Sequence, residues 1–150
     1  MNPKPASKIL RFPETKYPAW QIELPQGWAV VPGNPDSLRV MNQAKTGSID
    51  LYYDDMVSAD NLKIKLDAFL KGAGFDSSKG QKVAMSGFNG LKYSKTAKSP
   101  EGVELNMDLV VIIIDNRYAL CQIIYTMPNQ SDAYEIIKAA EAMRLSRGNS

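Results

Sequence analysis

The chain has no histidine and a single cysteine, Cys121, among its 150 residues. Histidine is the commonest general base and the commonest metal ligand in proteins, so neither a Ser-His nor a Cys-His catalytic couple can form. One cysteine excludes an intramolecular disulfide, but it does not fix the compartment. Cys121 lies in an apolar, strand-like pattern over residues 118–123, which predicts a small buried hydrophobic side chain rather than a reactive thiol.

Long hydrophobic runs are also absent. The longest covers residues 109–114 and stops at Asp115, far short of the roughly 20 residues that a membrane-spanning helix needs. Residues 1–8 carry no hydrophobic signal region, and we predict a flexible leader over residues 1–16. Two origins of this leader stay open: a native cytoplasmic start, or the remainder of a chain from which a signal or lipid-anchoring segment has been cut.

The chain has little excess of charge of either sign. The 18 basic residues are balanced by 16 acidic residues, which leaves a net charge of +2. A dedicated nucleic-acid binder normally carries a strongly basic face. Lys92, Lys95 and Lys98 cluster loosely, as a solvated sheet surface would require. Nucleic acid is therefore not an expected partner.

Motifs for phosphate or metal binding are missing as well. Residues 72–80 are rich in glycine, but they follow a predicted helix and precede a predicted strand, which is the reverse of a phosphate loop. Asp54, Asp55 and Asp60 have a spacing that matches no calcium loop, and helix capping explains them equally well. We predict no catalytic, cofactor-binding or metal-binding residue and no enzymatic activity. An enzyme with this sequence would have to use carboxylates, lysine, tyrosine or a recruited cofactor.

The most informative pattern runs from Trp20 to Trp28. Residues 20–24 alternate between apolar and polar, Pro25 and Gly27 predict a tight turn, and residues 28–31 resume as a strand. We expect this corner to form the first hairpin of a sheet and Trp28 to anchor it in the core. Further strands are predicted over residues 38–42 and 48–53.

A helix follows, because residues 62–70 carry leucine and phenylalanine at helical spacing in a stripe that Ile64 widens. Ser58 or Asp60 can cap its start, and Gly72 or Gly74 can end it. Short strands are expected over residues 81–86 and 91–97, with a turn at residues 87–90.

Residues 103–114 first alternate and then become continuously apolar. This change predicts a central strand that is covered on one face at its start and on both faces further along. A two-residue turn at residues 115–116 leads into a returning strand over residues 117–127. Ser131 is expected to cap a final helix with an apolar face formed by Ala133, Ile136, Ile137, Ala140 and Met143.

The order of strands, helix, strands and helix predicts an α+β fold with a mainly antiparallel sheet. We predict a single domain over residues 17–146, followed by a frayed tail over residues 147–150. Because tyrosine is favoured at interfaces, Tyr52, Tyr93 and Tyr118 are candidates for contact with a partner. Arg117, at the predicted hairpin tip, joins them. Packing inside the domain is the alternative for the tyrosines, and a solvated turn charge is the alternative for Arg117.

Three segments together resemble the PsbP/Mog-like superfamily, including its bacterial DcrB-type members: residues 22–28 (Ile-Glu-Leu-Pro-Gln-Gly-Trp), residues 115–117 (Asp-Asn-Arg) and the helix start at residues 128–134. The resemblance implies an antiparallel sheet flanked by helices in an α/β/α sandwich, with no catalysis and no cofactor. Members act as accessory or binding proteins. They support the oxygen-evolving complex, bind the GTPase Ran, or serve bacteria as envelope lipoproteins and as chaperones for secreted effectors. No set of functional residues is shared, so no site is transferred.

The leading hypothesis is a non-enzymatic bacterial accessory or binding protein that acts through a protein partner. The resemblance and the polar leader favour the periplasm or cell envelope, after removal of a signal segment. Two alternatives stay open: a cytoplasmic chaperone or adaptor for a secreted protein, and a small-molecule or metal-binding module.

Overall fold

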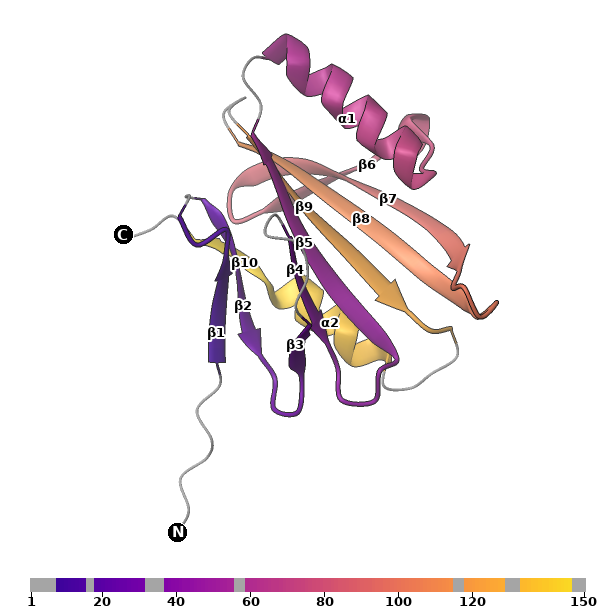
Figure 1. Ribbon diagram of the computed structural model, residues 1–150. Helices are drawn as coiled ribbons and strands as arrows, with labels where there is room; N and C mark the ends of the chain where they lie inside the picture. The colour runs from indigo at the N-terminus through magenta and orange to yellow at the C-terminus, as the bar shows by residue number, and fades with distance from the viewer. Residues whose placement is uncertain are drawn as a thin grey trace.

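The structure is a computed structural model of the chain and describes residues 8–15, 18–31, 37–55, 59–114, 118–128 and 133–146, with only the backbone at residues 55 and 59–63. Two α-helices, one 3-10 helix and ten strands are found in this part of the chain (Figure 1). In chain order they are β1 (Lys8–Phe12), β2 (Ala19–Leu24), β3 (Ala29–Val31), β4 (Ser37–Met41), β5 (Gly47–Asp55), α1 (Ala59–Ala73), η1 (Ser77–Lys79), β6 (Gln81–Met85), β7 (Phe88–Lys98), β8 (Glu104–Ile114), β9 (Tyr118–Thr126), α2 (Ala133–Ala142) and β10 (Arg144–Ser146).

The described strands form two sheets. The larger sheet has seven strands in the order β3-β4-β5-β9-β8-β7-β6, and the smaller has three in the order β1-β2-β10. Every pairing within them is antiparallel. The predicted α+β class with a mainly antiparallel sheet is therefore confirmed. Among the described residues, no helix is both long and apolar enough to span a membrane.

Each face of the seven-stranded sheet supports its own hydrophobic cluster. One cluster combines Ile112 and Leu120 of the sheet with Trp20 of β2 and Ile136 of α2. We call this the α2 face. The other cluster includes Leu109 and Val111 of the sheet and Leu70 of α1, and we call it the α1 face. The smaller sheet and α2 thus cover one side of the larger sheet, while α1 lies on the other side.

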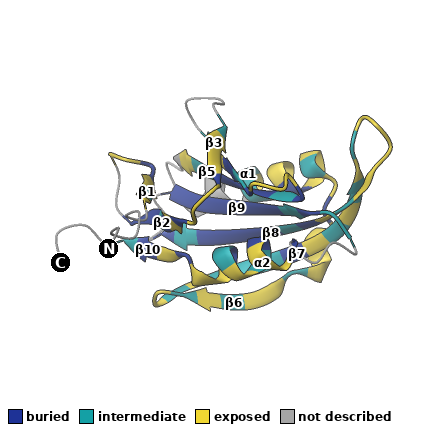
Figure 2. Ribbon diagram, turned by 90° about the horizontal axis from the view of Figure 1, so that it is seen from below, coloured by how far each residue is buried: buried dark blue, intermediate teal, exposed yellow. Residues whose placement is uncertain are grey.

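Strand β8 shows how the sequence pattern produces this arrangement. Met107, Leu109 and Val111 belong to the cluster on the α1 face, whereas Val110, Ile112 and Ile114 belong to the cluster on the α2 face. Side chains alternate between the faces of a strand, so a continuously apolar segment is buried from both sides. The predicted burial on both faces is confirmed for the second half of residues 103–114, whereas at the start of this segment Val103 is exposed and Leu105 is only half-buried. Figure 2 shows β8 and β9 as mainly buried while β6 is largely exposed.

The corner at residues 24–28 does not form a hairpin, and that prediction is wrong. Strand β2 belongs to the three-stranded sheet, while β3 pairs with β4 in the seven-stranded sheet. The Trp28 N–H donates to the Pro25 carbonyl (3.2 Å), and Gly27 adopts φ 88°, a conformation that costs glycine little. The corner therefore carries the chain from one sheet to the other. The predicted burial of Trp28 is confirmed.

Two strands lie where none was predicted. Strand β1 falls inside the predicted leader, pairs along its length with β2, and buries Phe12 in the core. Strand β10 follows α2 directly, pairs with β2, and buries Leu145. Neither segment alternates over enough residues to be recognised, since each becomes a strand only through its long-range pairing with β2. The folded region therefore begins at least nine residues before the predicted boundary at residue 17.

The β6–β7 turn also differs from its prediction at residues 87–90. The two turn residues are Ser86 (φ 52°) and Gly87 (φ 85°), and Phe88 already pairs with Met85. Gly90 lies inside β7, where a Cβ atom would come within 2.4 Å of the Val111 carbonyl oxygen. This glycine serves close strand packing rather than the turn.

Of the two glycines predicted to end helix α1, Gly74 does so: the helix ends at Ala73 and Gly74 adopts φ 81°. The N–H groups of Gly74 and Phe75 donate to the carbonyls of Lys71 (3.1 Å) and Leu70 (2.8 Å). The apolar stripe is narrower than predicted, because Leu70 is buried whereas Ile64 is 69% exposed. Ser58 and the Asp60 side chain lie outside the described residues.

Helix α2 buries the predicted Ala133, Ile136 and Ala140, and Met143 is buried just beyond its end, whereas the predicted Ile137 is only half-buried. Gln122 of β9 holds this end of the helix. Its Nε2 donates to the Ala140 carbonyl (3.4 Å) and lies 3.0 Å from Met143 Sδ. Ser131 and the turn at residues 115–117 lie outside the described part of the chain.

Candidate functional site

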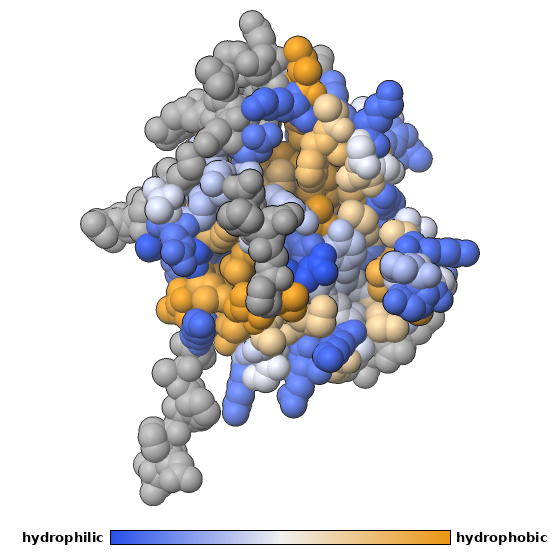
Figure 3. All heavy atoms as spheres, viewed as in Figure 1, coloured by the Kyte–Doolittle hydropathy of each residue, from blue (hydrophilic) through white to orange (hydrophobic). Residues whose placement is uncertain are grey.

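An open hollow lies on the α1 face of the seven-stranded sheet, toward the end of the sheet that α1 leaves uncovered. It has a volume of about 480 Å³. Its apolar lining comes from β4, β7, β8, β9 and their adjoining residues, namely Met41, Ala97, Val103, Leu105, Tyr125 and Met127. We call these six residues and the hollow they line the apolar groove. In Figure 3, orange and pale surface is exposed below α1 between blue side chains.

The register of the sheet explains why residues so far apart in sequence meet here. Met41 pairs with Ser48, which pairs in turn with Tyr125, and Leu105 pairs with Ala97. Residues paired across antiparallel strands point to the same face. Adjacent strands lie about 4.8 Å apart, so β4 and β7, four intervals apart, are separated by about 19 Å. The groove is therefore a broad trough rather than a closed cavity.

Basic side chains border the apolar groove. Arg39, Lys45 and Lys98 line the hollow, and no aspartate or glutamate is among its lining residues. Lys45 belongs to the turn between β4 and β5. Lys98 is the last residue of β7 and borders the hollow at the end of that strand, where the sheet register pairs it with Glu104 rather than with a residue of the groove. No carboxylate of the described residues forms an ion pair with either lysine. We call Lys45 and Lys98 the lysine rim.

A buried polar network fixes the turn that carries Lys45. The Asn42 side chain donates to Thr46 Oγ1 (2.7 Å) and to Glu135 Oε1 of α2 (3.0 Å), and its Oδ1 accepts the backbone N–H groups of Thr46 (3.0 Å) and Gly47 (3.2 Å). Lys45 itself adopts φ 59°, which is uncommon for a residue other than glycine. The backbone of Lys45 is therefore held in place by side chains around it.

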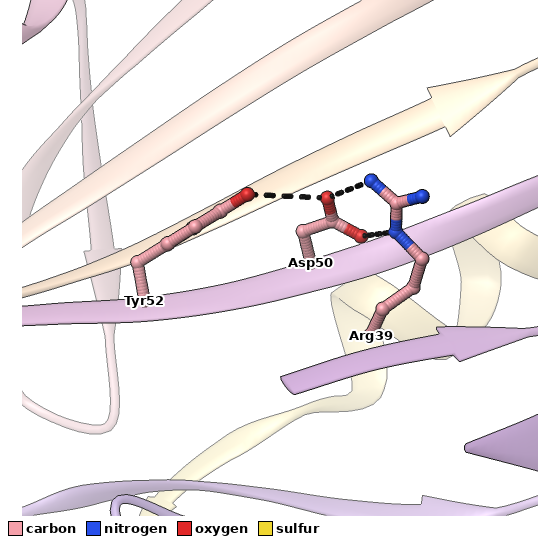
Figure 4. A network of polar contacts seen from close by, with 3 residues as sticks. All are labelled: Arg39, Asp50 and Tyr52. Carbon is pink, nitrogen blue, oxygen red and sulfur yellow. Dashed lines mark hydrogen bonds and ion pairs between the residues drawn. The ribbon is translucent and has the colours of Figure 1, made fainter. Parts of the chain in front are cut away.

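The polar centre of the α1 face is an ion pair beside the groove. Arg39 Nε and Nη2 donate to the two oxygens of Asp50 at 2.6 and 2.7 Å, and the Tyr52 hydroxyl donates to Asp50 Oδ2 at 3.3 Å (Figure 4). Arg39 comes from β4, and Asp50 and Tyr52 come from β5. The Asp50 side chain is 3% exposed and that of Arg39 is 45% exposed. Such a two-point contact satisfies the buried carboxylate while leaving part of the guanidinium accessible.

The hydroxyl groups of the tyrosines around this pair stay protonated at neutral pH. Burial, followed by the negative charge of Asp50, raises the pKa of Tyr52 to about 12. Burial and the Asp50 charge also raise the pKa of Tyr125, while the positive charge of Arg39 opposes this rise. The Arg39 guanidinium carbon lies 5.9 Å from the centre of the Tyr125 ring. This ring therefore offers an apolar surface next to a positive charge.

The three predicted partner-contact residues that the structure describes, Tyr52, Tyr93 and Tyr118, do not form one surface. Tyr52 is half-buried at the ion pair. Tyr93 is only 4% exposed, and its ring packs edge-on against Phe75 with centroids 6.3 Å apart. Tyr118 is 5% exposed, and its hydroxyl donates to the Pro18 carbonyl. For Tyr93 and Tyr118 the structure shows the alternative left open above, packing inside the domain, because each ring fills one of the two hydrophobic clusters. Arg117 lies outside the described residues.

Sequence reasoning missed the residues of the groove. Tyr125 lies inside the strand that was predicted correctly, but nothing in its local pattern distinguishes it from the buried residues beside it. The two lysines of the rim are separated by 53 positions and meet the groove only through the sheet order. The sequence predicts Lys98 on a solvated sheet surface, but it does not predict that Lys98 borders a groove.

Groups able to perform acid–base or metal chemistry are sparse in the described region. Burial, and then the charge of Asp54, raises the pKa of the Cys121 thiol to about 12, and the predicted burial of this cysteine is confirmed. Asp54 lies 3.7 Å from the Lys65 ammonium group. No cluster of three or more metal-ligating side chains occurs among the described residues. The side chains of Asp55 and Asp60 are outside them.

A second hollow, of about 770 Å³, is bordered by β1, β2 and the β3–β4 pair. Exposed Ile9 and Val30 contribute apolar surface to it. Its lining mixes the charges of Lys8, Arg11 and Glu14, whereas the lining of the apolar groove contains no acidic residue. The charged residues that line the apolar groove are therefore all basic, whereas those of the second hollow are of both signs.

No protein-family model matches the chain, and no curated protein matches it by sequence. Solved structures do match. LpqN of Mycobacterium tuberculosis, involved in cell envelope biogenesis, superposes with a TM-score of 0.62 at 14% identity, over 93% of this chain and 90% of LpqN. The PsbP protein of the cyanobacterium Synechocystis, CyanoP, gives a TM-score of 0.61 at 12% identity, over 95% of each chain.

A Bacteroides thetaiotaomicron protein also matches with a TM-score of 0.62 at 12% identity, over 87% of this chain. The match covers 46% of the Bacteroides chain, so the two proteins are alike over less than half of that protein's length. At these identities the likeness establishes the fold alone. The chain has a PsbP-like α+β fold, as the resemblance implied.

Proposed function

We propose that this protein is a non-enzymatic accessory protein of the bacterial cell envelope that binds a protein partner in the apolar groove. The observation that carries the proposal is the uneven covering of the sheet. On the α2 face, α2 and the smaller sheet cover the apolar side chains, and the uncovered end of β7 and β8 carries polar Ser94, Thr96 and Asn106. On the α1 face, the groove leaves apolar Val103 39% exposed and Leu105 half-buried. Open apolar surface rimmed by charge is typical of protein interaction sites.

The chemistry of the groove favours binding over catalysis. Its lining includes no histidine, cysteine or carboxylate, and the pKa of Tyr125 is raised. A general base must hold a usable lone pair near the working pH. Lysine, arginine and protonated tyrosine supply hydrogen-bond donors and positive charge instead, which suit recognition of an acidic group.

The likeness in fold to LpqN, a protein involved in cell envelope biogenesis, supports placement in the envelope. A DcrB-type envelope protein, exported by a signal segment that is later removed, fits the same proposal. Fractionation of the organism that encodes the chain tests this part. The protein is expected with the periplasmic or membrane fraction, and its recovery with the cytoplasmic proteins would contradict envelope placement.

Site-specific photo-cross-linking tests the binding surface. A benzoylphenylalanine placed at Val103, beside the groove, is expected to capture a defined partner in the native cell. The same residue at Tyr134, which is exposed on α2, serves as the matched control. The adduct at Val103 should disappear when Leu105→Glu places a charge on the groove floor. Equal capture at Val103 and Tyr134, or capture that survives Leu105→Glu, would rule out the groove as the binding surface.

A further inference from the structure

We infer that the apolar groove receives an amphipathic helix of the partner, laid beside α1, with acidic residues along both of its flanks. This inference rests on the proposed function and specifies the segment that the partner contributes. It follows from the width of the uncovered face, the nature of the groove floor and the position of the lysine rim.

The α1 face has room for a second helix. Seven strands spaced about 4.8 Å apart make a sheet about 29 Å wide, whereas a helix with its side chains is about 10–12 Å across. Helix α1 alone therefore covers less than half of that width. The groove floor, which extends about 19 Å from β4 to β7 across β5, β9 and β8, is wider than one helix, and α1 packs on other residues of these strands. An extended peptide would leave much of this trough uncovered.

The groove floor suits the apolar side of a helix. Leu105, Met127 and Met41 contribute flexible aliphatic or thioether side chains, and Tyr125 contributes a ring. Methionine adapts its shape to different partner side chains, because its side chain is unbranched and polarizable. Helices that lie in apolar grooves present residues three and four positions apart as anchors, and a floor of this kind can receive them.

The charges beside the floor specify the flanks of the helix. Lys45 lies on the β4–β5 side of the groove and Lys98 on the β7 side, with the apolar strands between them. Neither is ion-paired with a carboxylate in the described part of the chain. The charge of Arg39 is balanced by Asp50, whereas no carboxylate is among the residues that line the hollow beside the two lysines. Glu104, the acidic residue opposite Lys98 in the sheet register, is not part of that lining. A helix with acidic residues on both sides of its apolar stripe would meet one lysine on each side.

The test uses a synthetic amphipathic peptide of about 18 residues, which forms a helix of about 27 Å. Leucine and alanine form its apolar stripe, and glutamate flanks the stripe on both sides. Fluorescence anisotropy of the labelled peptide is expected to show saturable binding that weakens as salt concentration rises. A peptide with lysine in place of every glutamate should bind at least about tenfold more weakly, because each favourable charge contact becomes a repulsion.

Two double variants make the assignment specific. Lys45→Glu/Lys98→Glu should weaken binding of the acidic peptide about tenfold and should improve binding of the basic peptide. Lys82→Glu/Lys138→Glu changes the net charge equally, but on β6 and α2, and should leave both affinities unchanged. Circular dichroism establishes that both variants are folded. The inference is overturned if the two peptides bind equally well, or if the two double variants behave alike.

A lipid occupant gives a different result in the same assay. Binding of oleate that depends on Lys45 and Lys98, without binding of the acidic peptide, would assign the groove to a fatty acid and overturn the inference. Cross-linking separates this failure from failure of the proposed function. If Val103 still captures a protein partner while the acidic peptide does not bind, the proposed function stands and only the acidic helix is wrong.

Discussion

The two faces of the seven-stranded sheet are built by the same strands, yet they are closed to very different extents. On the α2 face, side chains such as Ile112 and Leu120 are fully buried beneath elements from both ends of the chain. On the α1 face, a single helix covers Leu109 and Val111, and the sheet beyond it forms the apolar groove. The same strand can therefore bury side chains that stabilise the fold on one face and expose side chains for binding on the other.

The difference lies in how many elements cover each face. The apolar side chains of the α2 face are covered by α2, β2 and β10, and Gln122 links the end of α2 to the sheet through its hydrogen bond to the Ala140 carbonyl. On the α1 face, Lys95 of β7 links the sheet to the helix in a similar way, because its ammonium group donates a hydrogen bond to the Ala73 carbonyl at the end of α1. Beyond that point no described element lies over Leu105 and Tyr125. A second helix from a partner would make the two faces alike.

The largest expected effect compares one residue type on the two faces. Leu120→Ala, on the α2 face, should lower the free energy of unfolding by about 2–5 kcal/mol, because it leaves a cavity in a fully buried site. Leu105→Ala, in the groove, should lower it by less than about 1 kcal/mol, because water can enter the space. Chemical denaturation measures both. Equal losses would mean that the groove is as much a part of the core as the α2 face.

A somewhat smaller effect is expected from breaking the ion pair on the α1 face. Arg39→Ala should lower the free energy of unfolding by about 2–3 kcal/mol, because it leaves the Asp50 carboxylate buried without its partner. Replacing both residues, as Arg39→Met/Asp50→Leu, should recover most of this loss. A double-mutant cycle measured by denaturation tests the coupling. If the double variant is no more stable than Arg39→Ala, the pair is not the source of the loss.

The next effect concerns Cys121, under α1. Its pKa of about 12 in the folded protein lies above the ordinary value of 9.0, so the folded state holds the proton more tightly. The contribution of the protonated Cys121 thiol to the free energy of unfolding is complete below pH 9 and is lost as the pH rises toward 12. From pH 9 to pH 10 the loss should be about 1 kcal/mol. Urea denaturation at several pH values measures it.

Cys121→Ala supplies the control, since alanine has no proton to lose. Its stability at pH 9 is lower because of the lost side-chain volume, but the slope between pH 9 and pH 10 should be shallower than in the parent chain. Identical slopes would show that Cys121 does not titrate differently in the folded and unfolded protein.

The smallest effect on stability is expected at the edge of the groove. Val103→Ser should change the free energy of unfolding by no more than about 0.5 kcal/mol, because Val103 is already partly exposed. It should nevertheless weaken binding of the acidic peptide, since it removes apolar surface from the groove. Comparing denaturation with anisotropy separates the two effects. A large loss of stability would indicate that Val103 belongs to the core.

The sequence alone predicts the elements whose pattern is local. Alternation followed by continuous apolarity in residues 103–114 predicted a strand buried on both faces, and Gly74 predicted the end of α1. Pairing between distant segments could not be read in this way. The corner at Pro25 and Gly27 has the local pattern of a hairpin turn, whereas β1, the strand that β2 joins, has no local pattern that separates it from a leader.

The groove illustrates the same limit. Met41, Leu105 and Met127 come from separate parts of the chain, and each resembles an ordinary core residue in its own segment. They form a surface only because the sheet order brings them together and because α1 stops short of them. Recognising that surface requires knowing which part of a face is left uncovered, and this is a property of the complete fold.

Methyl NMR of methionine-labelled protein tests most directly whether the uncovered half of the α1 face is the binding surface. Met41 and Met127 line the groove, whereas Met85 and Met143 pack on the α2 face. On titration with the acidic peptide, the methyl signals of Met41 and Met127 should shift together and saturate, while those of Met85 and Met143 remain in place. Saturable shifts confined to Met85 and Met143, or no shifts at Met41 and Met127 when the peptide is bound, would contradict the assignment of the groove.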